Sequence, residues 1–149
     1  MGFTGIDLKN NKATIYEGGS NKFSAATMVQ VGEGVAAVLK HDKETANQVV
    51  PIESFLTSQN DNLAAVEREG RKLTVEHQTV QALIEGSQAG IKAGNPYALY
   101  GLIQASLFTP GHGSDMSAEA EKWRGILGLK KLDLQEETKK VLAEMGTQA

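Results

Sequence analysis

The residue types most able to do chemistry in this chain are three histidines, at positions 41, 77 and 112. No two of them share a spacing that would bring them together on one helix face or strand, so they predict no metal site. His112 is the best functional candidate, because it lies in a loop flanked by glycines with Asp115 three residues later. The alternative for His112 is a solvent-exposed turn, which the loop composition favours.

One glycine motif, Gly32-Glu33-Gly34-Val35-Ala36-Ala37, matches the G-x-G-x-x-A pattern of dinucleotide-binding loops, with Glu53 about 20 residues on. Such glycines let backbone N–H groups approach a pyrophosphate. The alternative places both glycines inside a helix that begins after Thr27. The helix is favoured because its apolar stripe already includes Met28, and because Glu33 would put a negative charge beside the phosphates. We therefore predict no cofactor-binding residue in this chain.

Motifs for nucleophilic attack and proton transfer are missing as well. No G-x-S-x-G sequence occurs, and none of the three tyrosines is followed by a lysine four positions later. The absence of cysteine excludes thiolate zinc sites, disulfides and cysteine nucleophiles. No catalytic residue is therefore predicted. Four large aromatic side chains are interpreted as helix-packing core in preference to a substrate cage, namely Tyr97, Tyr100, Phe108 and Trp123. Phe108 borders the glycine loop and could serve both roles.

Length and composition are typical of one ordinary domain. The chain has 149 residues, of which 40% are hydrophobic, close to the globular average. Its 15 Lys and Arg against 18 Asp and Glu give a net charge of −3, which argues against a nucleic-acid partner and a basic membrane anchor. No apolar run approaches the roughly 20 residues of a membrane helix, and the N-terminus has no leader pattern. These features predict a cytoplasmic protein with no membrane contact.

Short strands come early and helices late, an order that predicts an α+β fold with one domain over residues 1–149. Residues 13–16 and 22–24 are predicted to form a hairpin. A further strand is expected at residues 48–53, at a sheet edge or with a bulge, because Pro51 cannot donate to a ladder. Residues 72–77 alternate between apolar and polar, which predicts a half-buried strand.

The second half of the chain is predicted to be rich in helices. One helix begins earlier, after Thr27, and carries one apolar stripe: Met28, Val31, Val35, Val38 and Leu39. Further helices begin at the capping residues Ser58, Thr79, Ser117 and Asp133. Two of the helices are expected to end at Gly70 and Gly128.

Several sequence blocks, read in order, carry a family resemblance. The first runs from Gly5 to Tyr16 (GIDLKNNKATIY) and is followed by Gly-Gly-x-Asn-Lys-Phe-Ser over residues 18–24. The others are residues 35–39, residues 54–60, the strand of residues 74–77, the loop of residues 111–115, and residues 127–129. Together these blocks cover nearly the whole chain. The series resembles the NmrA-like, isoflavone-reductase-like family of atypical short-chain dehydrogenases, in its fungal branch.

The resemblance implies that this chain corresponds only to the C-terminal, substrate-binding part of such a reductase. In that family an N-terminal Rossmann half binds NADP(H) and carries the glycine-rich loop, the residue that reads the ribose, and a catalytic lysine. No residue here matches them, so the chain looks truncated relative to the family. It is expected to bind no cofactor alone and to transfer no hydride, while NADP(H) is expected for a full-length relative.

The substrate implied by the resemblance is a small molecule, aromatic or conjugated. Its pocket is predicted from apolar or loop residues beside glycine-rich turns: Phe3, Phe55, Phe108 and His112. A substrate-binding part on its own should also expose apolar surface, which predicts a homo-oligomer or binding of the missing Rossmann half.

Two other functions stay open. One is a non-catalytic regulatory or protein-binding module, as some NmrA-like proteins are. The other is a small cyclase or isomerase that uses a pocket histidine. Only in the latter case should His112→Ala abolish turnover while the fold persists.

Overall fold

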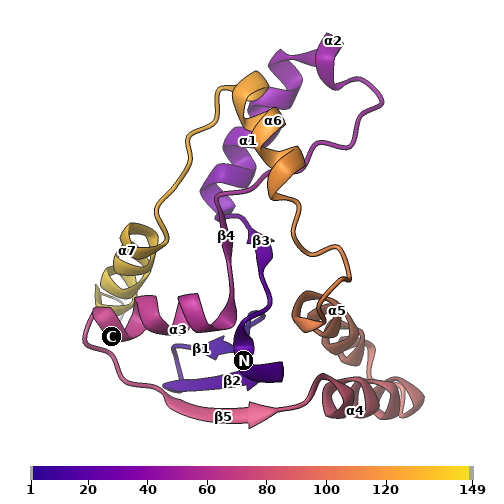
Figure 1. Cartoon of the computed structure of the whole chain (residues 1–149), viewed down its shortest axis with the longest axis vertical. Coiled ribbons are helices and arrows are strands. Elements are labelled where there is room, and N and C mark those ends of the chain that lie inside the picture. Colours follow the sequence, from indigo (N-terminus) through magenta and orange to yellow (C-terminus); the bar gives the residue numbers. More distant parts are fainter. Residues whose placement is uncertain (1, 148–149) are drawn as a thin grey trace. The chain divides into compact units, whose positions relative to one another are not determined.

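The computed structural model describes residues 2–147, which form two compact units. The first unit contains residues 2–23 and Ser58–Ser114, and the second contains Ser24–Thr57 and residues 115–147. Both units mix short strands with helices, as Figure 1 shows, so the predicted α+β class is confirmed. The prediction of one domain over residues 1–149 stays a prediction.

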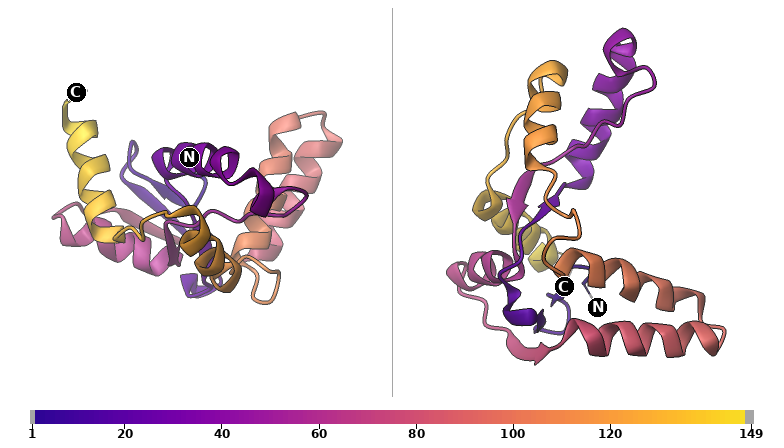
Figure 2. Two further views of the ribbon diagram at one scale, coloured as in Figure 1. Left: turned by 90° about the horizontal axis from the view of Figure 1, so that it is seen from above. Right: turned by 45° about the vertical axis from the view of Figure 1, so that its right-hand side comes forward.

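The first unit holds one small sheet and its larger helices. Its elements are β1 (Ile6–Asp7), β2 (Lys12–Tyr16), the 3-10 helix η1 (Glu17–Gly19), α3 (Gln59–Arg68), β5 (Thr74–Gln78), α4 (Val80–Lys92), the 3-10 helix η2 (Pro96–Ala98) and α5 (Leu99–Phe108). Helices α4 and α5 lie side by side in each view of Figures 1 and 2.

The second unit begins within β3 (Phe23–Ala25), whose first residue belongs to the first unit. Its other elements are α1 (Met28–Lys40), α2 (Asp42–Thr45), β4 (Phe55–Thr57), α6 (Ser117–Leu127) and α7 (Leu134–Thr147). Strands β3 and β4 form a two-stranded sheet. No helix over the described residues combines the length and apolar character needed to cross a bilayer.

The sheet of the first unit has the order β1-β2-β5, with β1 antiparallel and β5 parallel to β2. The central strand β2 is buried from Ala13 to Tyr16. The edge strand β5 is exposed along its whole length. The strand predicted at residues 72–77 is therefore confirmed as β5, but its half-burial is wrong, because all five of its residues are exposed.

The predicted hairpin between residues 13–16 and residues 22–24 is wrong, although residues 13–16 do belong to a hairpin. Strand β2 pairs with β1 across a turn that includes Asn11, whose φ is +50°. Residues 23–25 pair with β4 instead. The reason lies in η1, where Glu17, Gly18 and Gly19 have φ values of +46°, +74° and +71° and turn the chain away from β2.

The core of the first unit is built around Phe108. Its ring stacks on Tyr16 with centroids 5.1 Å apart and meets Phe23 edge-on at 6.1 Å. All three rings are at most 2% exposed. Offset and edge-on arrangements of this kind stabilise aromatic clusters beyond the burial of their area.

Gln59, at the start of α3, fastens the segments around β2. Its side chain is 1% exposed; Oε1 accepts from the backbone N–H of Tyr16 at 2.8 Å. Its Nε2 donates to the carbonyls of Thr4 at 3.0 Å and Thr14 at 2.8 Å. One buried amide thus satisfies three backbone groups that β-ladders leave unpaired.

Helix starts and ends follow their capping residues. Thr27, Ser58 and Thr79 each accept a hydrogen bond from the backbone N–H three residues later. Asp133 does the same for Glu136 at 2.9 Å. Gly128 ends α6 in the left-handed region, with φ of +64°. These boundaries confirm the capping predictions, except that Met116, not Ser117, occupies the N-cap of α6.

The helix after Thr27 is confirmed as α1, but the residues of its apolar stripe are not its buried positions. Met28 and Leu39 are 84% and 75% exposed. The buried positions are Gln30, whose amide bonds to Ser54 and to the carbonyl of Lys130, and Gly34. A Cβ at Gly34 would collide with Ile52, so the bare glycine lets this face of α1 approach closely.

The strand predicted at residues 48–53 is also wrong. This segment is irregular, and strand β4 begins only at Phe55. Pro51 has no N–H to give to a ladder, Val49 is 82% exposed, and only Glu53 at the end of the segment is buried.

Candidate functional site

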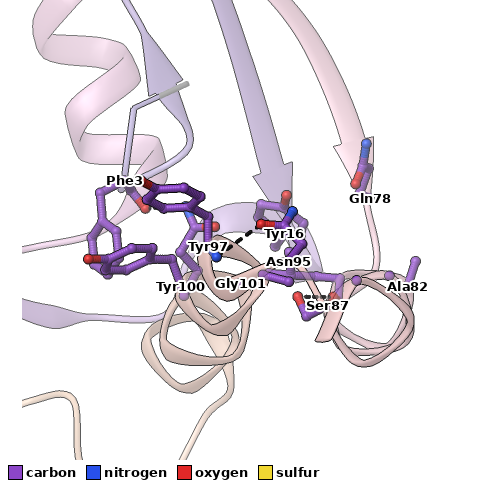
Figure 3. A pocket seen from close by; sticks show the side chains of 14 residues that line it. Phe3, Tyr16, Gln78, Ala82, Ser87, Asn95, Tyr97, Tyr100 and Gly101 are labelled. Carbon is purple, nitrogen blue, oxygen red and sulfur yellow. Dashed lines mark hydrogen bonds between the residues drawn. The ribbon is translucent and has the colours of Figure 1, made fainter. Parts of the chain in front are cut away.

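A cavity of about 760 Å³ lies in the first unit beside α4, η2 and α5. This volume is in the range of pockets that hold small organic molecules. Figure 3 shows the side chains around it. The lining residues are Phe3, Tyr16, Gln78, Ala82, Leu83, Gly86, Ser87, Gly90, Asn95, Tyr97, Ala98, Tyr100, Gly101 and Gln104.

Small residues form the helical wall of the cavity. Ala82, Gly86 and Gly90 follow one another at intervals of four on α4, so they share one face of that helix. A Cβ at Gly90 would lie 2.7 Å from the Cβ of Ala98, and one at Gly101 would collide with Ser87. The glycines therefore allow close packing of α4 against η2 and α5, while Gly86 has open space above it.

Three aromatic rings stand at the cavity with much of their surface exposed. Phe3, Tyr97 and Tyr100 are 46%, 75% and 56% exposed. Phe3 is held by its carbonyl, which accepts from Nε2 of Gln104 at 2.5 Å. Asn95 positions Tyr97 because its Oδ1 accepts from the Tyr97 backbone N–H at 3.0 Å (dashed line in Figure 3). Rings placed in this way can cover a flat apolar ligand.

Two lining residues are the last residues of parallel strands. Tyr16 ends β2 and Gln78 ends β5, and the register pairs them directly. Ligands of open α/β sheets bind outside the carboxyl ends of parallel strands, where the chain leaves the sheet. This cavity likewise lies at the carboxyl ends of two parallel strands, β2 and β5.

The cavity is electrically neutral. Among the described residues that line it, none is Asp, Glu, Lys, Arg or His. Burial raises the pKa of Tyr16 above its ordinary value of 10.0, so its hydroxyl stays protonated at neutral pH. A charged ligand would lose its hydration without meeting an opposite charge, whereas an uncharged one carries no such cost. The lining therefore suits an uncharged ligand.

The four residues predicted for a substrate pocket lie in different environments. Phe3 lines the cavity, and Phe108 lies in the core, stacked on Tyr16. His112 is exposed in the loop after α5, and Phe55 is half-buried on β4 in the second unit. A substrate role for these four residues stays a prediction.

Sequence reasoning missed the two tyrosines that border the cavity. Tyr97 and Tyr100 were expected in the core, as were Phe108 and Trp123, and only the latter two are buried. Asn95-Pro96 is the signal that could have separated them, because this pair interrupts the helical pattern and starts a new turn. Residues beside such a turn contact fewer neighbouring side chains than residues inside a long helix.

The other candidate motifs have ordinary structural places. Gly32 and Gly34 lie in the middle of α1, which confirms the helical interpretation of the G-x-G-x-x-A motif. Within the described part of the chain, no three His, Asp or Glu side chains come close enough to share a metal ion.

Comparison with known proteins finds relatives that align with most of this chain. Oxidoreductase poxI of Penicillium oxalicum is 35% identical over 143 residues, which are 93% of this chain and 45% of that protein. The same figures hold for poxI of strain 114-2. Oxidoreductase aprR of Aspergillus flavus is 38% identical over 72 residues, 48% of this chain and 23% of that protein.

This chain is similar to fungal oxidoreductases. That finding confirms the predicted resemblance in its broad form, because the relatives are oxidoreductases and come from fungi. The chain spans less than half the length of the first relatives. No family model matches the chain, and no solved structure matches it.

Proposed function

We propose that this chain is the substrate-binding part of an NAD(P)H-dependent oxidoreductase of the NmrA-like, isoflavone-reductase-like type. The observation that carries the proposal is the uncharged, aromatic-bordered cavity at the carboxyl ends of β2 and β5. The similarity to poxI over 93% of the chain supports the oxidoreductase context. The sequence blocks from Gly5 to residue 129 support the narrower family.

In this proposal the cofactor is held by another part of the protein. The aligned region is 45% of poxI, and the resemblance assigns the Rossmann half, with its NADP(H) site and lysine, to the remainder. Residues 1–149 act as one substrate domain and transfer no hydride alone. Their contribution is to bind the substrate and to exclude water around it.

The substrate class follows from the lining of the cavity. Exposed rings at Phe3, Tyr97 and Tyr100 favour a flat aromatic or conjugated molecule. The absence of charged side chains among the described lining residues favours a molecule without a carboxylate or an amine. Phe3 is thus part of the proposed pocket, as predicted from the sequence.

Nuclear magnetic resonance titration of the isotope-labelled chain tests the proposal. Acetonaphthone, an uncharged aromatic ketone, should shift the backbone amides of Gly86, Gly90 and Gly101, which line the cavity. Naphthoate, of similar shape but charged, should shift them much less. NADPH should leave Gly32 and Gly34 unchanged. Shifts from NADPH at those glycines, or none from acetonaphthone, would contradict the proposal.

Filling the cavity should remove binding without unfolding the chain. Gly86→Leu places a side chain into open space on the helical wall, so it should abolish acetonaphthone binding. Replacing a helical glycine should also stabilise α4 by up to about 1 kcal/mol. Gly125→Leu is the matched control, because Gly125 lies in α6, has open space above it and lines no part of the cavity. Binding retained in Gly86→Leu would show that the ligand site lies elsewhere.

A second candidate, a protein-binding module, is favoured by the apolar surface of α1. Met28, Val35 and Leu39 are 84%, 58% and 75% exposed and lie on one side of the helix. This surface should cause self-association or hold the Rossmann half that the family resemblance implies. Sedimentation velocity should show association that Val35→Lys with Leu39→Lys removes. A monomer at every concentration, with no affinity for the part of poxI outside the aligned region, would exclude this candidate.

A further inference from the structure

One hydroxyl group reaches the cavity from a side chain that is otherwise buried. Tyr16 is 2% exposed and lines the cavity. Its ring stacks on Phe108 with an interplanar angle of 8°, and its backbone N–H donates to Oε1 of Gln59 at 2.8 Å. The ring and the backbone are therefore fixed before any ligand arrives, so binding costs little side-chain entropy.

The hydroxyl of Tyr16 has no partner among residues 2–147 in the described structure. Its backbone N–H is paired with Gln59, but no described group accepts from or donates to its Oη. Tyr16 Oη is not among the fully buried unpartnered atoms of the described residues, so it can be reached from the cavity that Tyr16 lines. An incoming ligand atom can take this place.

The surroundings of the hydroxyl decide what that atom can be. Gln78 is the register neighbour of Tyr16 on β5 and supplies an exposed amide, and Asn95 supplies another (Figure 3). The described lining contributes no charge. Because burial raises the pKa of Tyr16, its hydroxyl keeps its proton and can donate it.

We infer that Tyr16 is a specificity-determining residue whose Oη donates a hydrogen bond to an uncharged acceptor oxygen, such as a ketone carbonyl, on a flat aromatic ligand. This inference rests on the proposed function and deepens it. The stacked rings fix the position of the donor, and the exposed rings of Tyr97 and Tyr100 cover the ligand. The cavity therefore distinguishes an aromatic ketone from the corresponding hydrocarbon.

The test compares two uncharged probes of nearly equal shape, acetonaphthone and ethylnaphthalene, substituted at the same ring position. Only the first carries an acceptor oxygen. Tyr16→Phe removes the hydroxyl and keeps the ring stacked on Phe108. The dissociation constant for acetonaphthone should rise about threefold to tenfold, the range of one net hydrogen bond, and that for ethylnaphthalene should stay unchanged.

Ser106→Ala is the control, because it removes a hydroxyl from α5 that lines no part of the cavity. The Ser106 hydroxyl donates only to the carbonyl of Ile103 in its own helix. This variant should keep the wild-type ratio of the two dissociation constants. The inference is overturned if Tyr16→Phe weakens both probes equally or neither of them. If neither probe binds the wild-type chain, the proposed function fails and the inference fails with it.

Discussion

Replacing Phe108 by alanine should lower the free energy of unfolding of the first unit by about 3–5 kcal/mol. Phe108 is 1% exposed, and its removal leaves a space between Tyr16 and Phe23, which both contact its ring. The variant should also weaken acetonaphthone binding, because Tyr16 loses the ring that fixes its hydroxyl at the cavity.

The three tyrosines provide the measurement for this variant. They lie at positions 16, 97 and 100, all in the first unit, so their near-ultraviolet circular dichroism reports its unfolding in urea. Phe3→Ala is the control. Because Phe3 is 46% exposed, this variant should lower the free energy of unfolding by only about 1 kcal/mol. Equal losses in the two variants would show that Phe108 is not the centre of this core.

Replacing Arg124 by methionine should destabilise the second unit by about 3–5 kcal/mol. The side chains of Arg124 and Glu53 are only 8% and 4% exposed, and Nη2 lies 3.2 Å from Oε1. Without Arg124, the buried Glu53 carboxylate keeps the hydrogen bond from Ser24, at 2.5 Å, but no opposite charge. An uncompensated buried charge is costly because the protein interior solvates it poorly.

The fluorescence of Trp123, the single tryptophan of the chain, reports unfolding of the second unit. The double variant Arg124→Met with Glu53→Met removes both charges and should recover most of the loss, since apolar pairs often replace buried ion pairs without cost. If the double variant is as unstable as Arg124→Met alone, packing of the arginine stem, and not charge, explains the effect.

Local signals in the sequence predicted much of the fold. Thr27, Ser58 and Thr79 begin helices because their side chains accept from a backbone N–H three residues ahead, an interaction that needs no distant partner. Gly128 ends a helix because a left-handed residue is required there. Features of this kind depend only on neighbouring residues.

Features that depend on distant residues could not be predicted. Gln30 is buried because Ser54 and the carbonyl of Lys130 satisfy its amide, and neither partner is close in sequence. Gln30 is therefore buried on α1, whereas Met28 and Leu39 of its apolar stripe are exposed. Strand β2 likewise pairs with β5, which is distant in sequence, and not with the nearby residues 23–25.

The candidate site was predictable only in part, for the same reason. Phe3 was expected at a pocket and lines the cavity. The contribution of Tyr16 depends on its parallel pairing with β5 and on its stacking with Phe108, 92 positions later in the chain. No periodicity within one segment contains that information.

A crystal structure of the chain with acetonaphthone tests the central claim, that the first unit holds an uncharged aromatic ligand, most directly. The naphthalene ring should lie against the small-residue face of α4 and beneath the rings of Tyr97 and Tyr100. Its carbonyl oxygen should lie within hydrogen-bond distance of Tyr16 Oη. A ligand bound only to the second unit, or naphthoate ordered in this cavity in preference to the ketone, would contradict the account.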